Sequence, residues 1–165
     1  MARRVDLDHT LAPVRVPAQI LHELCRHALE NLPEECCGLV VGNSLERYLR
    51  PVPCRNDMTL RHRQDPTTYP RDGRAAFYMN PHDYDQALKA AEAAGESITA
   101  VYHSHVGAGP YLSEMDLAYA EHPGFPFPDA DQIVLPVFER VVRDVALFRR
   151  TADGFVGHPI EPVEA

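Results

Sequence analysis

The sequence contains no long hydrophobic run, and this absence sets the first limit on what the chain can be. No stretch approaches the roughly 18 consecutive apolar residues that a membrane-spanning helix needs. The first ten residues carry basic side chains with no apolar segment behind them, which is unlike a signal peptide. We therefore expect no membrane partner and a cytoplasmic location.

Positive charge is also scarce. Lys and Arg total 16 against 24 Asp and Glu, so the formal net charge is −8. A nucleic-acid-binding domain usually presents a basic face. The few arginines in this chain are dispersed along the sequence, and we therefore expect no nucleic-acid partner.

Cysteine is limited to four residues, of which Cys36 and Cys37 are adjacent and cannot easily pair with each other. A reducing compartment with free, buried thiols is the simplest setting for them. No Cys-x-x-Cys pair is present. Its absence sets aside a zinc nucleoside deaminase, whose signature combines His-x-Glu with Pro-Cys-x-x-Cys.

The 165 residues, of which 45% are hydrophobic, suit a single domain over residues 1–165 with its own core. Helices are predicted over residues 18–31 and from Asn80 or Pro81 to about residue 94, because apolar residues recur there at helical spacing. Ser113 is a suitable N-cap for a further short helix.

Strands are predicted in segments of apolar or alternating character. These segments are residues 14–17, 36–42, 47–53, 75–79, 97–103, 132–138 and 143–149, with Phe155 in a last strand. Residues 56–73 are rich in charged and turn-forming residues, and we expect a long excursion without regular structure. Strands and helices alternate without regular βαβ spacing, so the sequence predicts an α/β (α+β) domain with a mixed sheet.

The most informative segment is Tyr102-His103-Ser104-His105, followed by Asp116 after ten intervening residues. On a strand, His103 and His105 share one face about 7 Å apart, whereas Ser104 faces the other way. Two imidazoles and one carboxylate leave the fourth tetrahedral position of Zn²⁺ open, as in catalytic sites. The alternative is a pair of satisfied core histidines with a helix-capping aspartate.

A carboxylate near such a site can take a proton from water whose pKa the metal has lowered to about 7. Glu34 and Glu35 directly precede the apolar strand predicted over residues 36–42. The alternative for this pair is a solvated strand end. Four residues around the 56–73 segment either shape a substrate groove or belong to a loop without function: Tyr69, Pro70, Arg71 and Tyr78.

Two motifs together resemble those of the JAMM (MPN-plus) metalloproteases of the bacterial or archaeal stand-alone type. The first is Pro33-Glu34-Glu35-Cys36-Cys37-Gly38, in which the family glutamate falls on Glu35. The second is His-x-His, ten residues and Asp, with Ser three residues before the Asp; it is matched by His103, His105, Ser113 and Asp116. The resemblance extends over about residues 15–150. Val106 and Leu112 stand where the family often has proline.

The resemblance implies a mostly antiparallel curved sheet flanked by helices, similar to the cytidine deaminase fold. It implies one catalytic Zn²⁺ held by His103, His105 and Asp116. It also implies that Glu35 is the general base that later protonates the leaving amine, and that Ser113 donates a hydrogen bond to the oxyanion.

The same resemblance implies a metallopeptidase or isopeptidase that cleaves an amide bond at the C-terminal tail of a ubiquitin-like or sulfur-carrier protein. The tail would lie beside a strand of the enzyme as an added β-strand. The alternative is a non-catalytic scaffold that binds a ubiquitin-like protein without cutting it. Retention of the whole ligand set favours the enzyme.

Overall fold

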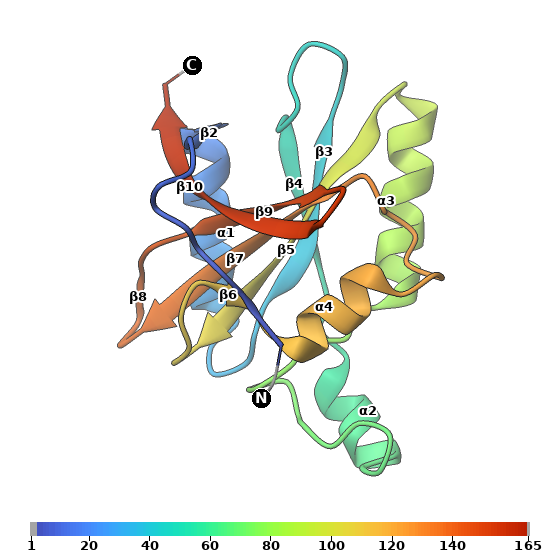
Figure 1. Ribbon diagram of the computed structural model, residues 1–165. Helices are drawn as coiled ribbons and strands as arrows, with labels where there is room; N and C mark the ends of the chain where they lie inside the picture. The colour runs from blue at the N-terminus through green and yellow to red at the C-terminus, as the bar shows by residue number, and fades with distance from the viewer. Residues whose placement is uncertain (1–2, 165) are drawn as a thin grey trace.

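A mixed eight-stranded sheet forms the centre of the molecule in the computed structural model, which describes residues 3–164 (Figure 1). Its strand order is β2-β10-β9-β7-β5-β3-β4, and β8 pairs with β7. The β10–β2 and β7–β5 pairs are parallel and the other pairs are antiparallel. The predicted mixed, mostly antiparallel sheet is therefore confirmed.

The strands are β1 (Val5–Asp6), β2 (Val14–Pro17), β3 (Cys37–Gly42), β4 (Arg50–Cys54), β5 (Ser97–Val106), β6 (Tyr111–Leu112), β7 (Asp131–Phe138), β8 (Val141–Val142), β9 (Ala146–Thr151) and β10 (Gly154–Val163). The helices are α1 (Ala18–Glu30), α2 (Met58–Gln64), α3 (Pro81–Ala93) and α4 (Glu114–Glu121). Strands β1 and β6 form a separate two-stranded sheet.

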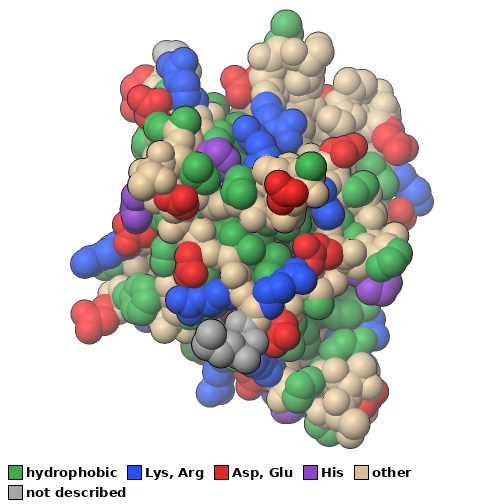
Figure 2. Space-filling view, viewed as in Figure 1, with side chains coloured by type: hydrophobic (Ala, Val, Ile, Leu, Met, Phe, Trp, Pro, Cys, Tyr) green, Lys and Arg blue, Asp and Glu red, His purple; other side chains and the backbone are tan. Residues whose placement is uncertain are grey.

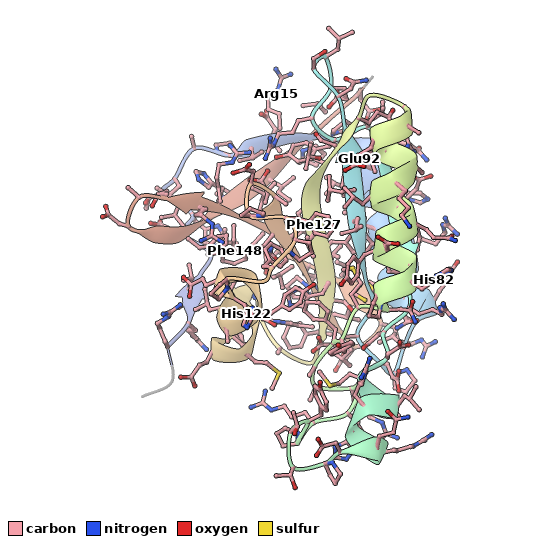
Figure 3. All side chains as sticks on the ribbon, turned by 90° about the vertical axis from the view of Figure 1, so that its right-hand side faces the viewer. Arg15, His82, Glu92, His122, Phe127 and Phe148 are labelled. Atoms are coloured by element: carbon pink, nitrogen blue, oxygen red, sulfur yellow. The ribbon has the colours of Figure 1, made fainter. Side chains whose placement is uncertain are left out.

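Helices cover both faces of the large sheet (Figures 1 and 3). Helix α1 buries Ile20, Leu24 and Ala28, which recur every four residues and so form one stripe against the sheet. Helix α3 packs on the opposite face, where its Ala87 joins a cluster that includes Val101 of β5. The alternating residues of β5 therefore belong to two different cores.

Two sequence-based predictions about the middle of the chain are wrong. Residues 56–73 contain the helix α2, whose start is held by the side-chain oxygen of Asn56 accepting from the Met58 N–H at 2.9 Å. Residues 75–79 form no strand and make only an isolated bridge between Met79 and Asn56. Ala76, Phe77 and Met79 are buried by packing on the sheet face, which imitates the apolar pattern of a strand.

Charged side chains of both signs are interspersed over the face shown in Figure 2. Among the described residues, no helix combines the length and the apolar character that crossing a membrane requires.

The buried carboxylate of Asp131 joins the start of β7 to its surroundings. It accepts hydrogen bonds from the Arg47 and Arg149 guanidinium groups at 2.9–3.1 Å and from the Tyr48 hydroxyl at 2.6 Å. Burial by itself would raise the pKa of Asp131, but the hydrogen bonds from Arg149, Tyr48 and Arg47 hold that pKa below its usual value. Since β7 pairs with β5, this network supports the strand that carries both candidate histidine ligands.

We expect Asp131→Asn to lower the free energy of unfolding at pH 7 by about 2–4 kcal/mol, because it removes the charge that both guanidinium groups pair with. The pKa of Asp131 is lower in the native chain than in the unfolded chain, where it is about 3.9. Its contribution to stability is therefore fully present at pH values above about 3.9 and is lost as the pH falls through the native pKa. Urea unfolding at pH 7 and pH 3 should therefore show a smaller acid-induced loss in the variant than in the parent chain. The exposed neighbour Asp129 supplies the control Asp129→Asn, and equal pH dependence in all three proteins would contradict the prediction.

Candidate active site

His103 and His105 lie on β5 and point to the same side of the sheet. Their side chains are buried, and their Nε2 atoms are 3.2 Å apart. Ser104 points to the opposite side, where its hydroxyl accepts from the Cys36 N–H at 2.7 Å. The alternation predicted for this strand is confirmed, and the structural role expected for Ser104 is confirmed with it.

Asp116 reaches the two histidines from the first turn of α4. Its Oδ2 atom lies 3.3 Å from Nε2 of His103 and 3.2 Å from Nε2 of His105. Ser113 caps this helix: its hydroxyl accepts from the Asp116 N–H at 3.0 Å, and its own N–H donates to Asp116 Oδ2 at 2.9 Å. This capping box fixes the carboxylate beside the imidazoles.

The three donor atoms are spaced as the ligands of one small cation would be. All three lie within 4.8 Å of one another, and the distances between pairs are 3.2, 3.2 and 3.3 Å. Bonds of 2.0–2.1 Å to a tetrahedral Zn²⁺ give an edge of about 3.3 Å between ligand atoms. The donor set therefore fits a zinc ion, and the role of these residues as ligands stays a prediction.

A backbone carbonyl selects the tautomer of neutral His105. Its Nδ1 lies 2.9 Å from Gly109 O, which can only accept, so in the neutral imidazole Nδ1 carries the proton and Nε2 has a lone pair for a metal ion. His103 is held differently, by the Phe77 ring stacked on it at a centroid distance of 4.5 Å. Within residues 3–164, His103 Nδ1 has no hydrogen-bond partner.

The loop between β5 and α4 is pinned by the start of the chain. Strand β1 pairs with β6, and the Leu7 N–H donates to Pro110 O at 3.0 Å. Gly107 has a φ of 75°, a left-handed conformation that favours glycine. The loop is therefore held by backbone bonds to the segment around β1, a strand that the sequence did not predict.

Glu35 is buried, and three hydrogen bonds fix its backbone. Its N–H donates to Gly73 O at 2.7 Å, and its carbonyl accepts from the side-chain amides of Asn31 at 2.8 Å and Asn56 at 2.9 Å. Burial and the negative charge of Asp116 raise the pKa of Glu35 to about 9, while Arg71 acts to lower it. For Asp116, burial would raise the pKa, but the charges and hydrogen bonds of His103 and His105 hold it well below its usual value.

Glu35 lines one cavity of about 190 Å³ together with two members of the donor cluster, His105 and Asp116. Its lining residues are Glu35, Arg71, Arg74, Ala75, His105, Val106, Ala108, Tyr111, Ser113, Met115 and Asp116. Residues on β5, on α4 and before β3 thus come together although they are far apart in the sequence. The cavity presents a carboxyl group, a candidate metal site and a serine hydroxyl to the same small volume.

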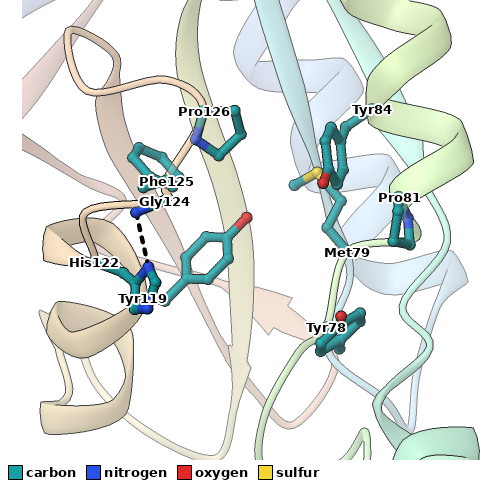
Figure 4. A pocket seen from close by; sticks show the side chains of 9 residues that line it. All are labelled: Tyr78, Met79, Pro81, Tyr84, Tyr119, His122, Gly124, Phe125 and Pro126. Carbon is teal, nitrogen blue, oxygen red and sulfur yellow. Dashed lines mark hydrogen bonds between the residues drawn. The ribbon is translucent and has the colours of Figure 1, made fainter.

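A second, aromatic pocket of about 160 Å³ adjoins the site. It is lined by Tyr78, Met79, Pro81, Tyr84, Tyr119, His122, Gly124, Phe125 and Pro126. Figure 4 shows the Tyr119 ring projecting between the Phe125–Pro126 turn and the Tyr84 side chain. Tyr119 also packs edge-on against Phe77, which links this pocket to the ring stacked on His103.

Four further histidines lie outside the donor cluster. His27 Nδ1 lies 2.7 Å from the Tyr102 hydroxyl on the α1 side of the sheet, and His22 is part of the same helix. His82 and His122 are exposed. All four cysteines are free, as predicted.

Several supporting residues gave no signal in the sequence. Asn31 and Asn56 clamp Glu35, Phe77 stacks on His103, and Arg74 lines the cavity. Of the residues expected near a substrate groove, Arg71 lines the same cavity as Glu35 and Tyr78 lines the aromatic pocket. Tyr69 lies beside Tyr78, with ring centroids 5.7 Å apart.

The family model for prokaryotic homologs of the JAB domain matches residues 17–150. The chain belongs to this JAB family. Two solved structures support the fold of this JAB chain. A protein from Desulfitobacterium hafniense is 19% identical to it and has a TM-score of 0.63, and the match covers 92% of this chain and 94% of that protein. A protein from Salinibacter ruber is 23% identical with a TM-score of 0.57 over 92% and 91%.

Curated relatives of this JAB chain include three kinds of protein. The tail tip assembly protein K of Escherichia phage N15 is 36% identical over 96 residues, 58% of this chain, and the match spans only 31% of the phage protein. The desampylase of Haloferax volcanii is 26% identical over 70% of this chain and 78% of its own length. The CysO-cysteine peptidase of Mycobacterium tuberculosis is 23% identical over 90% of each chain.

Proposed function

We propose that this JAB-family chain is a zinc-dependent hydrolase that cleaves an amide bond at the C-terminal tail of a ubiquitin-like or sulfur-carrier protein. In this proposal residues 1–165 form one catalytic domain, His103, His105 and Asp116 hold the metal, and Glu35 is the general base. The observation that carries it is a cluster of three metal-ligand donors, two of which, His105 and Asp116, line one cavity with the buried Glu35 and with Ser113. The names desampylase and CysO-cysteine peptidase, borne by two relatives, support the substrate class.

The residues of the site have distinct tasks in such a hydrolysis. When bound, Zn²⁺ would act as a Lewis acid and lower the pKa of water at its open position. Glu35, with its backbone clamped by three hydrogen bonds, takes a proton from the attacking water and delivers it to the leaving amine. The positive charge of the bound ion would lower the pKa of Glu35 from about 9 and so favour the carboxylate that this step requires. The Ser113 hydroxyl accepts from the Asp116 N–H, so its own proton is free to be donated to the developing oxyanion.

Cleavage of carrier fusions tests the proposal. Each substrate is a ubiquitin-like or sulfur-carrier protein whose C-terminal carboxyl group is joined to an added amino acid or peptide, and mass spectrometry identifies the bond that is cut. We expect the zinc-loaded chain to release the carrier at its own C-terminus and a chelator to abolish the reaction. Binding of the carrier without cleavage by zinc-loaded protein would instead favour the non-catalytic scaffold.

A further inference from the structure

Two arginines on one turn bring unpaired positive charge to the catalytic cavity. Arg71 and Arg74 both line it, and Arg71 is close enough to Glu35 to act on its pKa. Within residues 3–164, neither guanidinium lies within 4.0 Å of a carboxylate oxygen. Exposed arginines such as Arg63 also lack such a partner, and what sets Arg71 and Arg74 apart is that both line the cavity that holds Glu35. In a chain of net charge −8, two free guanidinium groups at one small cavity point to an anionic ligand.

The turn that carries both arginines is anchored to the candidate base. The Glu35 N–H donates to Gly73 O at 2.7 Å, and the Gly73 N–H donates to the Thr59 hydroxyl at 2.9 Å. That hydroxyl in turn donates to the Glu34 carboxylate at 2.6 Å. A Cβ atom at Gly73 would lie 2.7 Å from Glu34 Oε1, so a larger residue there would have to displace the Glu34 carboxylate that Thr59 holds. The backbone of both arginines is therefore held in a constant position relative to Glu35.

We propose that Arg71 and Arg74 bind the α-carboxylate of the leaving group, so that the preferred substrate is a carrier whose C-terminal carbonyl is joined to the α-amine of a single amino acid. This inference rests on the proposed hydrolase function. Water adds across the carbon–nitrogen bond: its hydroxyl joins the carbonyl carbon of the carrier, and its proton goes to the leaving amine. The products are the free carrier and a free amino acid.

The chemistry of the leaving group distinguishes this substrate from an isopeptide. In an amino acid the carboxylate is two bonds from the scissile nitrogen, within the volume that both guanidinium groups line. A lysine side chain within a protein brings its ε-amine to the same place without a carboxylate. The planar guanidinium binds carboxylates through paired hydrogen bonds, and the cavity of about 190 Å³ is smaller than the pockets that hold drug-sized ligands.

A matched pair of substrates measures the role of this carboxylate. Both are the same carrier with one alanine added, ending in a free carboxylate in one and in a carboxamide in the other. Hydrogen bonds to a charged group are typically strong enough for a 10- to 100-fold preference. We expect the parent chain to favour the free acid at least tenfold in kcat/KM. The R71Q/R74Q double variant should lose this preference, so that its kcat/KM values for the two substrates become equal, whatever change both rates share through Glu35. The exposed Arg63 of α2 supplies the control Arg63→Gln, which should keep the preference.

Binding gives a second readout that does not depend on turnover. In the Glu35→Gln background, calorimetric titration should show at least tenfold tighter binding of the free acid than of the carboxamide. Adding R71Q/R74Q should remove that difference.

Three results have separate meanings. Equal cleavage of the matched pair by the parent chain overturns the carboxylate inference and leaves the hydrolase proposal standing. This result is expected if the arginines bind an acidic side chain of the carrier tail instead of the α-carboxylate of the leaving group. Equal loss on both substrates in the R71Q/R74Q variant also overturns the inference, because the arginines would then act only through Glu35. No cleavage of either substrate by the zinc-loaded parent chain overturns the hydrolase proposal itself.

Discussion

Glu35→Gln should lower kcat for hydrolysis of a carrier fusion by about 100- to 10,000-fold, the usual contribution of a positioned general base. Glutamine has nearly the same shape as glutamate, so the backbone bonds to Gly73, Asn31 and Asn56 should survive the change. What disappears is the carboxylate that takes the proton from water. Zinc binding should persist, because the three candidate ligands are unchanged.

The measurement is single-turnover cleavage by protein whose zinc content has been determined. Glu30→Gln is the matched control, since Glu30 is an exposed glutamate at the end of α1 that pairs only with Arg26 within the described residues. The control should retain the parent rate. Unchanged turnover in Glu35→Gln would eliminate Glu35 as the base, and loss of zinc from that variant would show that its effect is not on proton transfer.

Asp116→Asn should weaken zinc binding by more than about 100-fold. Removing a residue that only hydrogen-bonds to a metal ligand typically costs about 10- to 100-fold in affinity, and loss of a ligand should cost more. The amide oxygen can still accept from the Ser113 N–H, so the cap of α4 is retained while the negative charge beside His103 and His105 is lost. Without that charge the imidazole pair should hold the cation poorly, and cleavage should fall with metal occupancy.

Thermal unfolding in chelator and in added zinc provides the readout. A ligand present at 100 times its Kd stabilises the native state by about 2.7 kcal/mol, which corresponds to a rise in Tm of about 5–10 °C for a domain of this size. The parent chain and the exposed-site control Asp153→Asn should both show this rise. An equal rise in Asp116→Asn would remove Asp116 from the ligand set.

Parts of the donor cluster can be predicted from the sequence pattern of single strands and helices. Strand alternation places His103 and His105 on one side and Ser104 on the other, because successive side chains of a strand point to opposite faces. Ser113 three residues before Asp116 is a capping box in sequence and in space. These features depend on contacts between near neighbours, so they are predictable without knowledge of the rest of the fold.

The 56–79 segment shows where local pattern fails. Its buried residues look like those of a strand, and its polar residues look like those of a loop. The Asn56 side chain instead holds the segment in another conformation, because it forms hydrogen bonds with the Met58 N–H at the start of α2, the Tyr78 N–H and the Glu35 carbonyl. The bonds to Tyr78 and Glu35 join positions about 20 residues apart, and no periodicity in the sequence predicts them.

The order of residues is enough to predict two imidazoles on one strand face, a capped aspartate, and a glutamate in a motif that resembles a metalloprotease family. The folded chain adds that Glu35 shares a cavity with Asp116, and that the turn carrying Arg71 and Arg74 is bonded to the Glu35 backbone. Local pattern does not predict these meetings because the residues are far apart along the chain. Side-chain direction follows from the backbone of one element, whereas the meeting of separate elements follows from sheet register and from packing across the whole core.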